Sequence, residues 1–217
     1  MAMSLALLLL GSACSAGDEI AAPRSETPSH IIAYVYGGEP EALGNLGAEM
    51  LTHLNYAFAN VTPEGEVVLG RAEDPARLAA LTALRSKNPN LKILLSVGGW
   101  GWSENFSDAA LTEASREQFA QSAVRLVTEH GLDGLDIDWE YPGQPGEDNV
   151  YRVEDKENFT LLLKTLRRHL DEQGTRAGRT DDEDYLLTIA AGAGPTYLAH
   201  TDMHAVQEVL VDRKSVV

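Results

Sequence analysis

Residues 133–142 read DGLDIDWEYP, a stretch in which acidic side chains alternate with large apolar ones. Side chains of a β-strand point to opposite faces in turn, so Asp136, Asp138 and Glu140 are predicted to share one face. The apolar residues between them would share the opposite face. We therefore expect a strand from about residue 132 to 141 that is acidic on one side and apolar on the other.

Further apolar stretches that stop at glycine or proline lie on both sides of this strand and predict more strands. The expected strands are residues 30–36, 53–59, 92–97 and 186–191. Helical patterns separate them. Asp74 and Asp155 are expected to cap two of these helices, and Ser115 is expected to form a capping box with Gln118 in a third. Helical connections between apolar strands indicate βαβ units, so the expected class is α/β with a parallel sheet.

The acidic face of the 133–142 strand has three interpretations. An edge strand could expose it to water. However, strands of parallel sheets are normally buried on both faces, so the acidic face of such a strand is expected to line a pore or a functional site. A calcium-binding loop of the EF-hand type is excluded, because its required glycine and bidentate glutamate are absent.

Three carboxylates placed two residues apart on one strand cannot all stay charged at low cost in a partly desolvated pocket. Burial and like-charge repulsion raise the pKa of at least one of them, which is how enzymes keep a carboxylic acid protonated near neutral pH. Glu140 lies nearest the carboxyl end of the strand, where barrel enzymes place catalytic groups, and is the best candidate for a proton donor. Asp138 is expected to hold negative charge beside it, and Asp136 to tune Asp138 from a deeper position.

The DGLDIDWEYP stretch, together with LLSVGGW at residues 94–100, resembles the signature of glycoside hydrolase family 18, the chitinase family. HLNYAFANV at 53–61, DKENFTLLLKTLRRHL at 155–170 and LLTIAAGAGPTY at 186–197 resemble further segments of the family, in the family's order. The resemblance implies a (β/α)8 TIM barrel of which only about the first five strand–helix units are present. Residues 30–217 would then form an incomplete catalytic domain.

The resemblance also implies a retaining, substrate-assisted mechanism without a protein nucleophile. Glu140 would act as the general acid and then as the general base. Asp138 would orient the acetamido group of the substrate, whose carbonyl oxygen attacks C1, and Asp136 would share a proton with Asp138. The implied substrate is chitin or an N-acetylglucosamine oligosaccharide with β-1,4 linkages.

Other positions that match the family are expected to bind substrate or support the acidic strand. Trp100 would stack on a sugar face, and Tyr141 follows the acid into the cleft. Tyr34 and Ser96 would balance the charge of the acidic strand.

The turn after the third strand and one aromatic residue complete the predicted site. Gly98 and Gly99 permit a tight turn and a close approach of chain or ligand. Phe58 would form the floor of the pocket, although a place in the core fits it equally well. Packing under a loop is the alternative role for Trp100 and for Trp102.

The composition excludes several classes of partner and cofactor. The chain has 217 residues and a formal net charge of −16, which argues against nucleic-acid binding. Its one cysteine excludes an internal disulfide and a cysteine-rich zinc site. His200 and His204 are four residues apart but lack further ligands of a known motif. No metal site and no cofactor are therefore expected, and the protein is expected to be a monomer.

The N-terminus has the pattern of an export signal. A short apolar run followed by small residues makes residues 1–16 a predicted signal peptide or lipoprotein signal, and residues 17–29 a flexible tether. Cys14 is the candidate site of a lipid anchor. The run is too short to span a membrane, and no other stretch is long enough, so no integral membrane domain is expected. The predicted location is secreted or attached to the bacterial cell surface.

The C-terminal end departs from the family. The family's sixth strand carries an M-x-Y-D motif and its eighth a tryptophan, and neither is present in this sequence. Three further strand–helix units would need about 90 more residues. We therefore expect a truncated or frameshifted chain that is weakly active or inactive by itself. Three functions remain open: a chitin hydrolase, an endo-β-N-acetylglucosaminidase that acts on N-glycans, and a non-catalytic carbohydrate-binding or inactive member.

Overall fold

The computed structural model describes residues 30–36, 47–180 and 184–210. The predicted signal, the tether, the candidate lipid site at Cys14 and residues 211–217 lie outside these described residues. Within them, no helix is long and apolar enough to cross a membrane.

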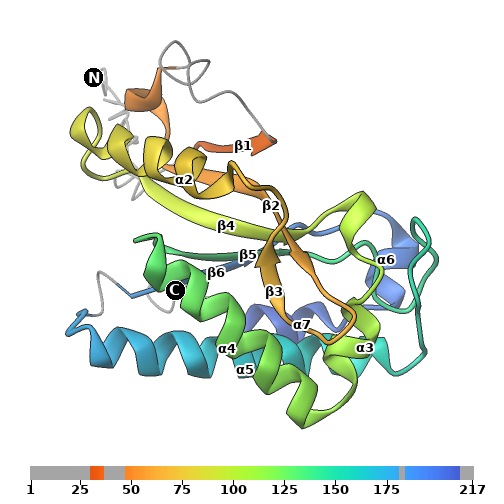
Figure 1. Cartoon of the computed structure of the whole chain (residues 1–217). Helices are drawn as coiled ribbons and strands as arrows, with labels where there is room; N and C mark the ends of the chain where they lie inside the picture. Colours follow the sequence, from red (N-terminus) through yellow and green to blue (C-terminus); the bar gives the residue numbers. More distant parts are fainter. Residues whose placement is uncertain (1–29, 37–46, 181–183, 211–217) are drawn as a thin grey trace, which may run out of the picture.

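Five parallel strands form the sheet, in the spatial order β1-β2-β4-β5-β6. They are β1 Ile32–Tyr36, β2 His53–Val61, β4 Lys92–Gly98, β5 Gly134–Asp138 and β6 Leu186–Ile189. The predicted α/β class and parallel sheet are therefore confirmed (Figure 1). The sequence missed a short antiparallel strand, β3 Val67–Leu69, which pairs with the end of β2 after a tight turn.

The helices connect successive strands, as βαβ topology requires, and α4 and α5 run side by side along one face of the sheet (Figure 1). The α-helices are α2 Asp74–Ala83, α3 Phe106–Leu111, α4 Glu113–Glu129, α5 Asp155–Arg176, α6 Pro195–Ala199 and α7 Met203–Gln207. Short 3₁₀ helices cover η1 Ala48–Met50, η2 Leu84–Ser86 and η3 Trp100–Trp102.

The start of α2 differs by one residue from the prediction. Glu73 is the N-cap, and Asp74 is the first helical residue. Its buried carboxylate accepts the backbone N–H of Arg71 at 2.9 Å and the hydroxyl of Tyr56 at 2.6 Å. Asp74 therefore fixes the loop before the helix rather than capping the helix itself.

The two other predicted helix starts are also corrected. Glu154 is the N-cap of α5, so Asp155 is its first helical residue. In α4 the capping box joins Thr112 to Ser115, and Gln118 takes no part in it. The prediction placed the helix start three residues too late because Ser115 is itself the third residue of the helix.

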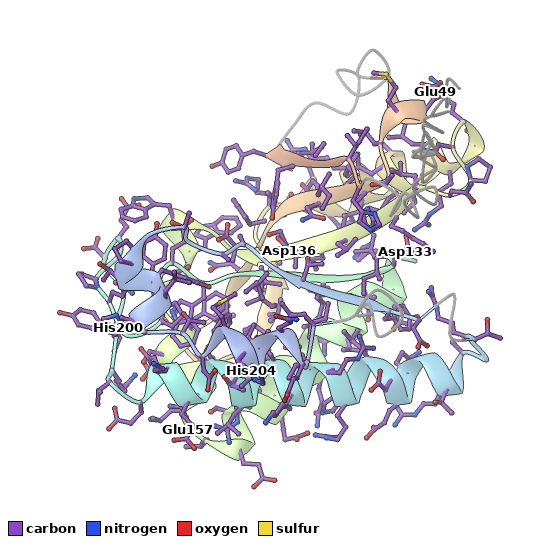
Figure 2. The ribbon with its side chains drawn as sticks, turned by 180° about the vertical axis from the view of Figure 1, so that it is seen from behind. Glu49, Asp133, Asp136, Glu157, His200 and His204 are labelled. Carbon is purple, nitrogen blue, oxygen red and sulfur yellow. The ribbon has the colours of Figure 1, made fainter. Side chains whose placement is uncertain are left out.

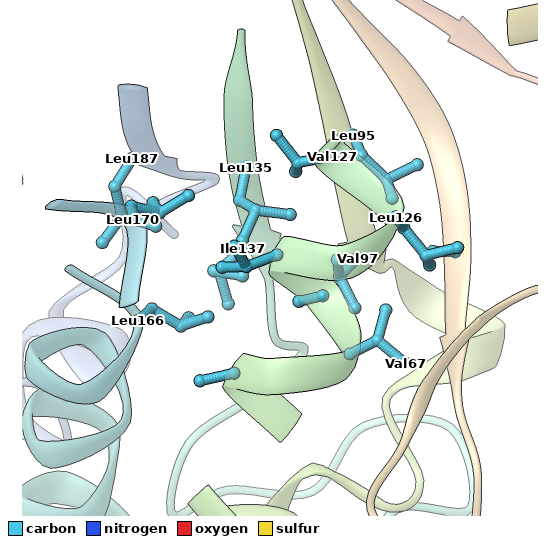
Figure 3. Packing of buried hydrophobic residues seen from close by; sticks show 14 of the residues in the cluster. Val67, Leu95, Val97, Leu126, Val127, Leu135, Ile137, Leu166, Leu170 and Leu187 are labelled. Atoms are coloured by element: carbon cyan, nitrogen blue, oxygen red, sulfur yellow. The ribbon is translucent and has the colours of Figure 1, made fainter. Parts of the chain in front are cut away.

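The apolar face of β5 packs against the helices. Leu135 and Ile137 are buried in one core with residues of α4 and α5 (Figure 3), and Trp139 belongs to the same core. The Trp139 ring stacks on Phe106 with centroids 5.4 Å apart and meets Phe159 edge-on at 5.6 Å. Because these residues face the helices, the alternating acidic residues must point to the opposite side, toward the interior of the curved sheet.

Candidate active site

Asp136 lies at the centre of a hydrogen-bond network that spans four strands. Its carboxylate accepts the hydroxyls of Tyr34 on β1 at 2.9 Å, Ser96 on β4 at 2.9 Å and Thr188 on β6 at 2.6 Å. Figure 2 shows Asp136 among the strands. Two strands separate β1 from β5, so the Tyr34 contact requires a strongly curved sheet. Three donors stabilise a negative charge on Asp136, which is almost completely buried.

Asp138 occupies the next position on the same face and has a strongly perturbed pKa. Burial, followed by the charges of Glu140 and Asp136, raises the pKa of Asp138 to about 7. The charges of the two neighbouring carboxyl residues thus favour the protonated form of Asp138. This direction is compatible with the expected sharing of a proton between Asp136 and Asp138.

Glu140 lies beyond the end of β5, because the strand ends at Asp138 rather than near residue 141 as predicted. The backbone is held there by Ser103, whose side chain is fully buried. The Ser103 Oγ accepts the N–H of Glu140 at 2.9 Å and donates to the carbonyl of Gly99 at 2.9 Å. One hydroxyl therefore joins the turn after β4 to the segment that carries Glu140.

The tyrosines of the site remain protonated as hydrogen-bond donors. Burial and then the charge of Asp136 raise the pKa of Tyr34, and hydrogen bonding to Glu140 raises the pKa of Tyr141. The Tyr141 ring lies 6.3 Å from Trp100 and 6.3 Å from Tyr197, both edge-on. These three aromatic side chains form a row beside Glu140.

Gly98 and Gly99 have positive φ angles of 107° and 82°. A Cβ at Gly98 would lie 2.3 Å from the carbonyl oxygen of Asp138, and one at Gly99 would lie 2.7 Å from the ring of Phe58. The Gly99 N–H also donates to the Asp138 carbonyl at 2.8 Å. Glycine is required here because β4 and β5 approach so closely.

A hollow of about 380 Å³ opens beside this turn. Its lining residues are Tyr36, Phe58, Arg71, Gly98, Trp100, Gly101, Trp102 and Glu147. Phe58 thus borders the hollow, while its predicted place at the floor of a substrate pocket stays a prediction. Trp100 is half exposed at the hollow. Trp102 packs closely over Gly70, where a Cβ would lie 2.2 Å from the indole ring. The face of Trp102 toward Gly70 therefore has the packing role that the sequence offered as an alternative to sugar binding.

Two hydroxyl residues of the site, Ser103 and Thr188, were missed by the sequence analysis. Thr188 lies in a strand that was predicted and Ser103 follows the 94–100 motif, and neither stands out by type. The signal for Thr188 is register: it pairs with Asp136 across adjacent parallel strands. Ser103 lies outside any strand, so only the three-dimensional path of the chain reveals its contacts.

The two histidines flagged in the sequence are not part of this network. His200 follows α6 and His204 lies in α7 (Figure 2). In the part of the chain that the structure describes, no group of three or more His, Cys, Asp or Glu side chains could hold a metal ion.

Comparisons with known proteins agree with this geometry. The model of the glycosyl hydrolases family 18 matches residues 30–216. Chitinase A1 of Niallia circulans is 38% identical over 209 residues, covering 74% of this chain and 29% of its own. A family 18 N-acetylglucosaminidase from Paenibacillus barengoltzii is 46% identical with a TM-score of 0.73, over 84% of this chain and 51% of its own.

A third relative is chitinase ChiW from a Paenibacillus species, described as part of a cell-surface-expressed, multi-modular enzyme. It is 40% identical with a TM-score of 0.73, over 84% of this chain and 23% of its own. The chain thus spans about half, or less, of the length of these relatives. The family match covers nearly all of the chain outside its first 29 residues, and the chain belongs to glycosyl hydrolase family 18.

Proposed function

We propose that this site belongs to a glycoside hydrolase that cleaves β-1,4 linkages between N-acetylglucosamine units. One observation carries the proposal: three interacting carboxyl groups lie at the carboxyl end of a buried parallel strand, and the pKa of the middle one is raised to about 7. Chitinases among the relatives support this substrate class.

The proposed reaction uses an N-acetyl group of the substrate as the nucleophile. Glu140 donates a proton to the glycosidic oxygen while the acetamido carbonyl oxygen forms a bond to C1 and the C1–O bond to the leaving sugar breaks. This step gives an oxazolinium ion. Glu140 then takes a proton from a water molecule that attacks C1, which restores the acetamido group with retained configuration.

Asp138 is proposed to bind and stabilise the acetamido group during this reaction. Its ionised form accepts the acetamido N–H and stabilises the positive charge that develops on the ring. The charge of Asp136, whose carboxylate accepts three hydroxyl groups, is one of the causes that raise the pKa of Asp138. Tyr34 and Ser96 act through Asp136 in this proposal, and Trp100 contacts the sugar.

The test is hydrolysis of a fluorogenic chitobioside by this chain, compared with Glu140→Gln. Turnover by the parent chain that is lost in Glu140→Gln while oligosaccharide binding persists would support the proposal. Turnover that persists in Glu140→Gln would refute the assignment of the acid. Binding without any turnover by the parent chain would favour the non-catalytic alternative.

Product analysis separates the remaining substrate alternatives. The N-acetylglucosaminidase from Paenibacillus barengoltzii favours release of single N-acetylglucosamine units as a second candidate activity. Monosaccharide released from chitohexaose from the first time point would support this candidate, whereas a mixture of oligomers would support internal cleavage. Cleavage of N-glycan cores with chitohexaose left intact would show instead an endo-β-N-acetylglucosaminidase.

Export and lipid attachment are also proposals. The pattern of residues 1–16 and the cell-surface expression of the ChiW relative support them. Labelled fatty acid incorporated into the expressed protein, and absent from Cys14→Ser, would support the anchor. Equal labelling of both proteins would contradict it.

A further inference from the structure

Arg71 is held at the hollow by aromatic contacts on two sides. Its guanidinium carbon lies 4.8 Å from the ring centre of Trp102 and 5.4 Å from that of Tyr36. Both distances are within the range of cation–π attraction. These rings restrict the guanidinium to the edge of the hollow that Trp102 and Tyr36 also line.

The backbone of Arg71 is also fixed. Its N–H donates to the buried Asp74 carboxylate at 2.9 Å, and its carbonyl accepts the Asp74 N–H at 3.2 Å. Asp74 is in turn bound by the Tyr56 hydroxyl. The backbone that carries the Arg71 side chain is therefore held in place. This lowers the conformational entropy that is lost when the side chain binds a ligand.

One donor atom of this ordered guanidinium lacks an acceptor. The Nη1 atom of Arg71 is buried and has no hydrogen-bond partner among the described residues. A buried charged donor without an acceptor is costly, and arginine has no uncharged state that could relieve the cost. An acceptor from a bound molecule would remove this cost.

The hollow lies beside the turn after β4, whose strand pairs with the strand that carries Asp136 and Asp138. Gly98 lines it and pairs in register with Asp138, while Trp100 offers a half-exposed aromatic face. Its volume of about 380 Å³ is in the range of small-ligand sites. An aromatic surface combined with a few fixed polar donors suits a sugar, which has apolar C–H faces and polar hydroxyl and carbonyl oxygens.

We propose that Arg71 is a substrate-binding residue, whose guanidinium donates to an oxygen atom of a sugar unit of the bound chito-oligosaccharide in this hollow. This inference rests on the proposed function, because it assumes the same substrate class. It adds a charged hydrogen bond to the stacking expected from Trp100. Arg71 contributes to affinity and takes no part in the proton transfers.

Calorimetric titration of chitohexaose into Glu140→Gln protein, which cannot turn over by the proposed mechanism, tests the inference. Arg71→Met keeps an unbranched apolar stem and removes the donor, and we expect its Kd to rise about tenfold or more. Arg71→Lys keeps the charge without the planar fork and should recover only part of the affinity. Arg125→Met is the matched control, because Arg125 is half exposed on α4 and forms only a 3.9 Å ion pair.

The outcomes separate this inference from the proposed function. The inference is supported if the parent and Arg125→Met bind chitohexaose equally well while Arg71→Met binds it more weakly. The thermal unfolding temperature of Arg71→Met should be unchanged. Equal affinity of Arg71→Met and the parent overturns the inference and leaves the proposed function intact. Failure of the Glu140-intact chain to bind or cleave any N-acetylglucosamine oligosaccharide overturns both. In a turnover assay, Arg71→Met should raise KM with kcat unchanged, whereas a fall in kcat alone would contradict a binding role.

Discussion

Replacing Asp138 by asparagine should stabilise the protein, and by an amount that grows with pH. The folded structure raises the pKa of Asp138 from 3.8 to about 7, mainly through burial and then through the charges of Glu140 and Asp136. Well below pH 3.8 the carboxyl group is protonated in both the folded and the unfolded state and contributes nothing. As the pH rises from about 4 to about 7, the unfolded chain loses this proton first, so the native state loses stability.

The size of the effect follows from the separation between the two pKa values. About three pH units at 1.36 kcal/mol each give about 4 kcal/mol as an upper bound. The Asp138 side chain is partly open to solvent, so screening reduces this to about 2 kcal/mol. Asp138→Asn has no such titration. Its advantage in the free energy of unfolding over the parent should therefore grow between pH 5 and pH 8 and level off at about 2 kcal/mol.

Urea unfolding followed by tryptophan fluorescence, to which the buried Trp139 contributes together with Trp100 and Trp102, measures this difference at pH 5, 6, 7 and 8. If the asparagine amide changes the packing, it shifts the free energy of unfolding by the same amount at every pH. The test is therefore how the difference between Asp138→Asn and the parent changes with pH. Glu129→Gln is the control, because Glu129 is exposed and forms only a 3.9 Å ion pair; its effect should stay within about 0.5 kcal/mol at each pH. A difference for Asp138→Asn that is constant from pH 5 to 8 would refute the electrostatic account of this site.

Two further predictions concern the turn that supports Glu140. Gly98→Ala should lower the free energy of unfolding by more than about 3 kcal/mol or prevent folding, because its Cβ would lie 2.3 Å from a backbone oxygen. Gly131 also has a positive φ but has open space around the Cβ, so Gly131→Ala should lower this free energy by only about 1 kcal/mol. Equal losses in chemical denaturation would show that φ alone, and not the close approach, matters at Gly98. Ser103→Ala should lower the free energy of unfolding by about 1–3 kcal/mol and reduce kcat more than it changes KM, since it removes the acceptor of the Glu140 N–H. Unchanged stability and kcat would mean that the backbone holds Glu140 in place without this hydroxyl.

The alternation of acidic and apolar residues in 133–142 was sufficient to predict a strand with two unlike faces. Period two is a local property of extended chain, so the apolar side at Leu135, Ile137 and Trp139 and the acidic side could be assigned without tertiary information. The parallel sheet followed from helical patterns between apolar strands. Helix starts were less exact because Asp74 and Asp155 are the right type for a cap, yet they use their carboxylates to hold the preceding loops.

The electrostatic arrangement depended on the tertiary structure. Asp136 gains donors from Tyr34, Ser96 and Thr188, which lie on other strands 102, 40 and 52 residues away in sequence. Their convergence requires curvature of the whole sheet, which no local pattern encodes.

The same reason explains why the sequence predicted an acidic face but could not give the pKa of each carboxyl group on it. The pKa of Asp138 depends on how much solvent the fold removes and on how closely Glu140 approaches after the strand ends. The hydrogen bond from the Glu140 N–H to Ser103 and the buried guanidinium nitrogen of Arg71 without a partner likewise depend on chain segments that meet only in the folded protein.

The sequence by itself determined which residues are candidates for the chemistry and named Tyr34 and Ser96 beside them. The tertiary structure decided the raised pKa of Asp138 and the contacts of Thr188 and Ser103, because desolvation and long-range contacts exist only once the chain has folded.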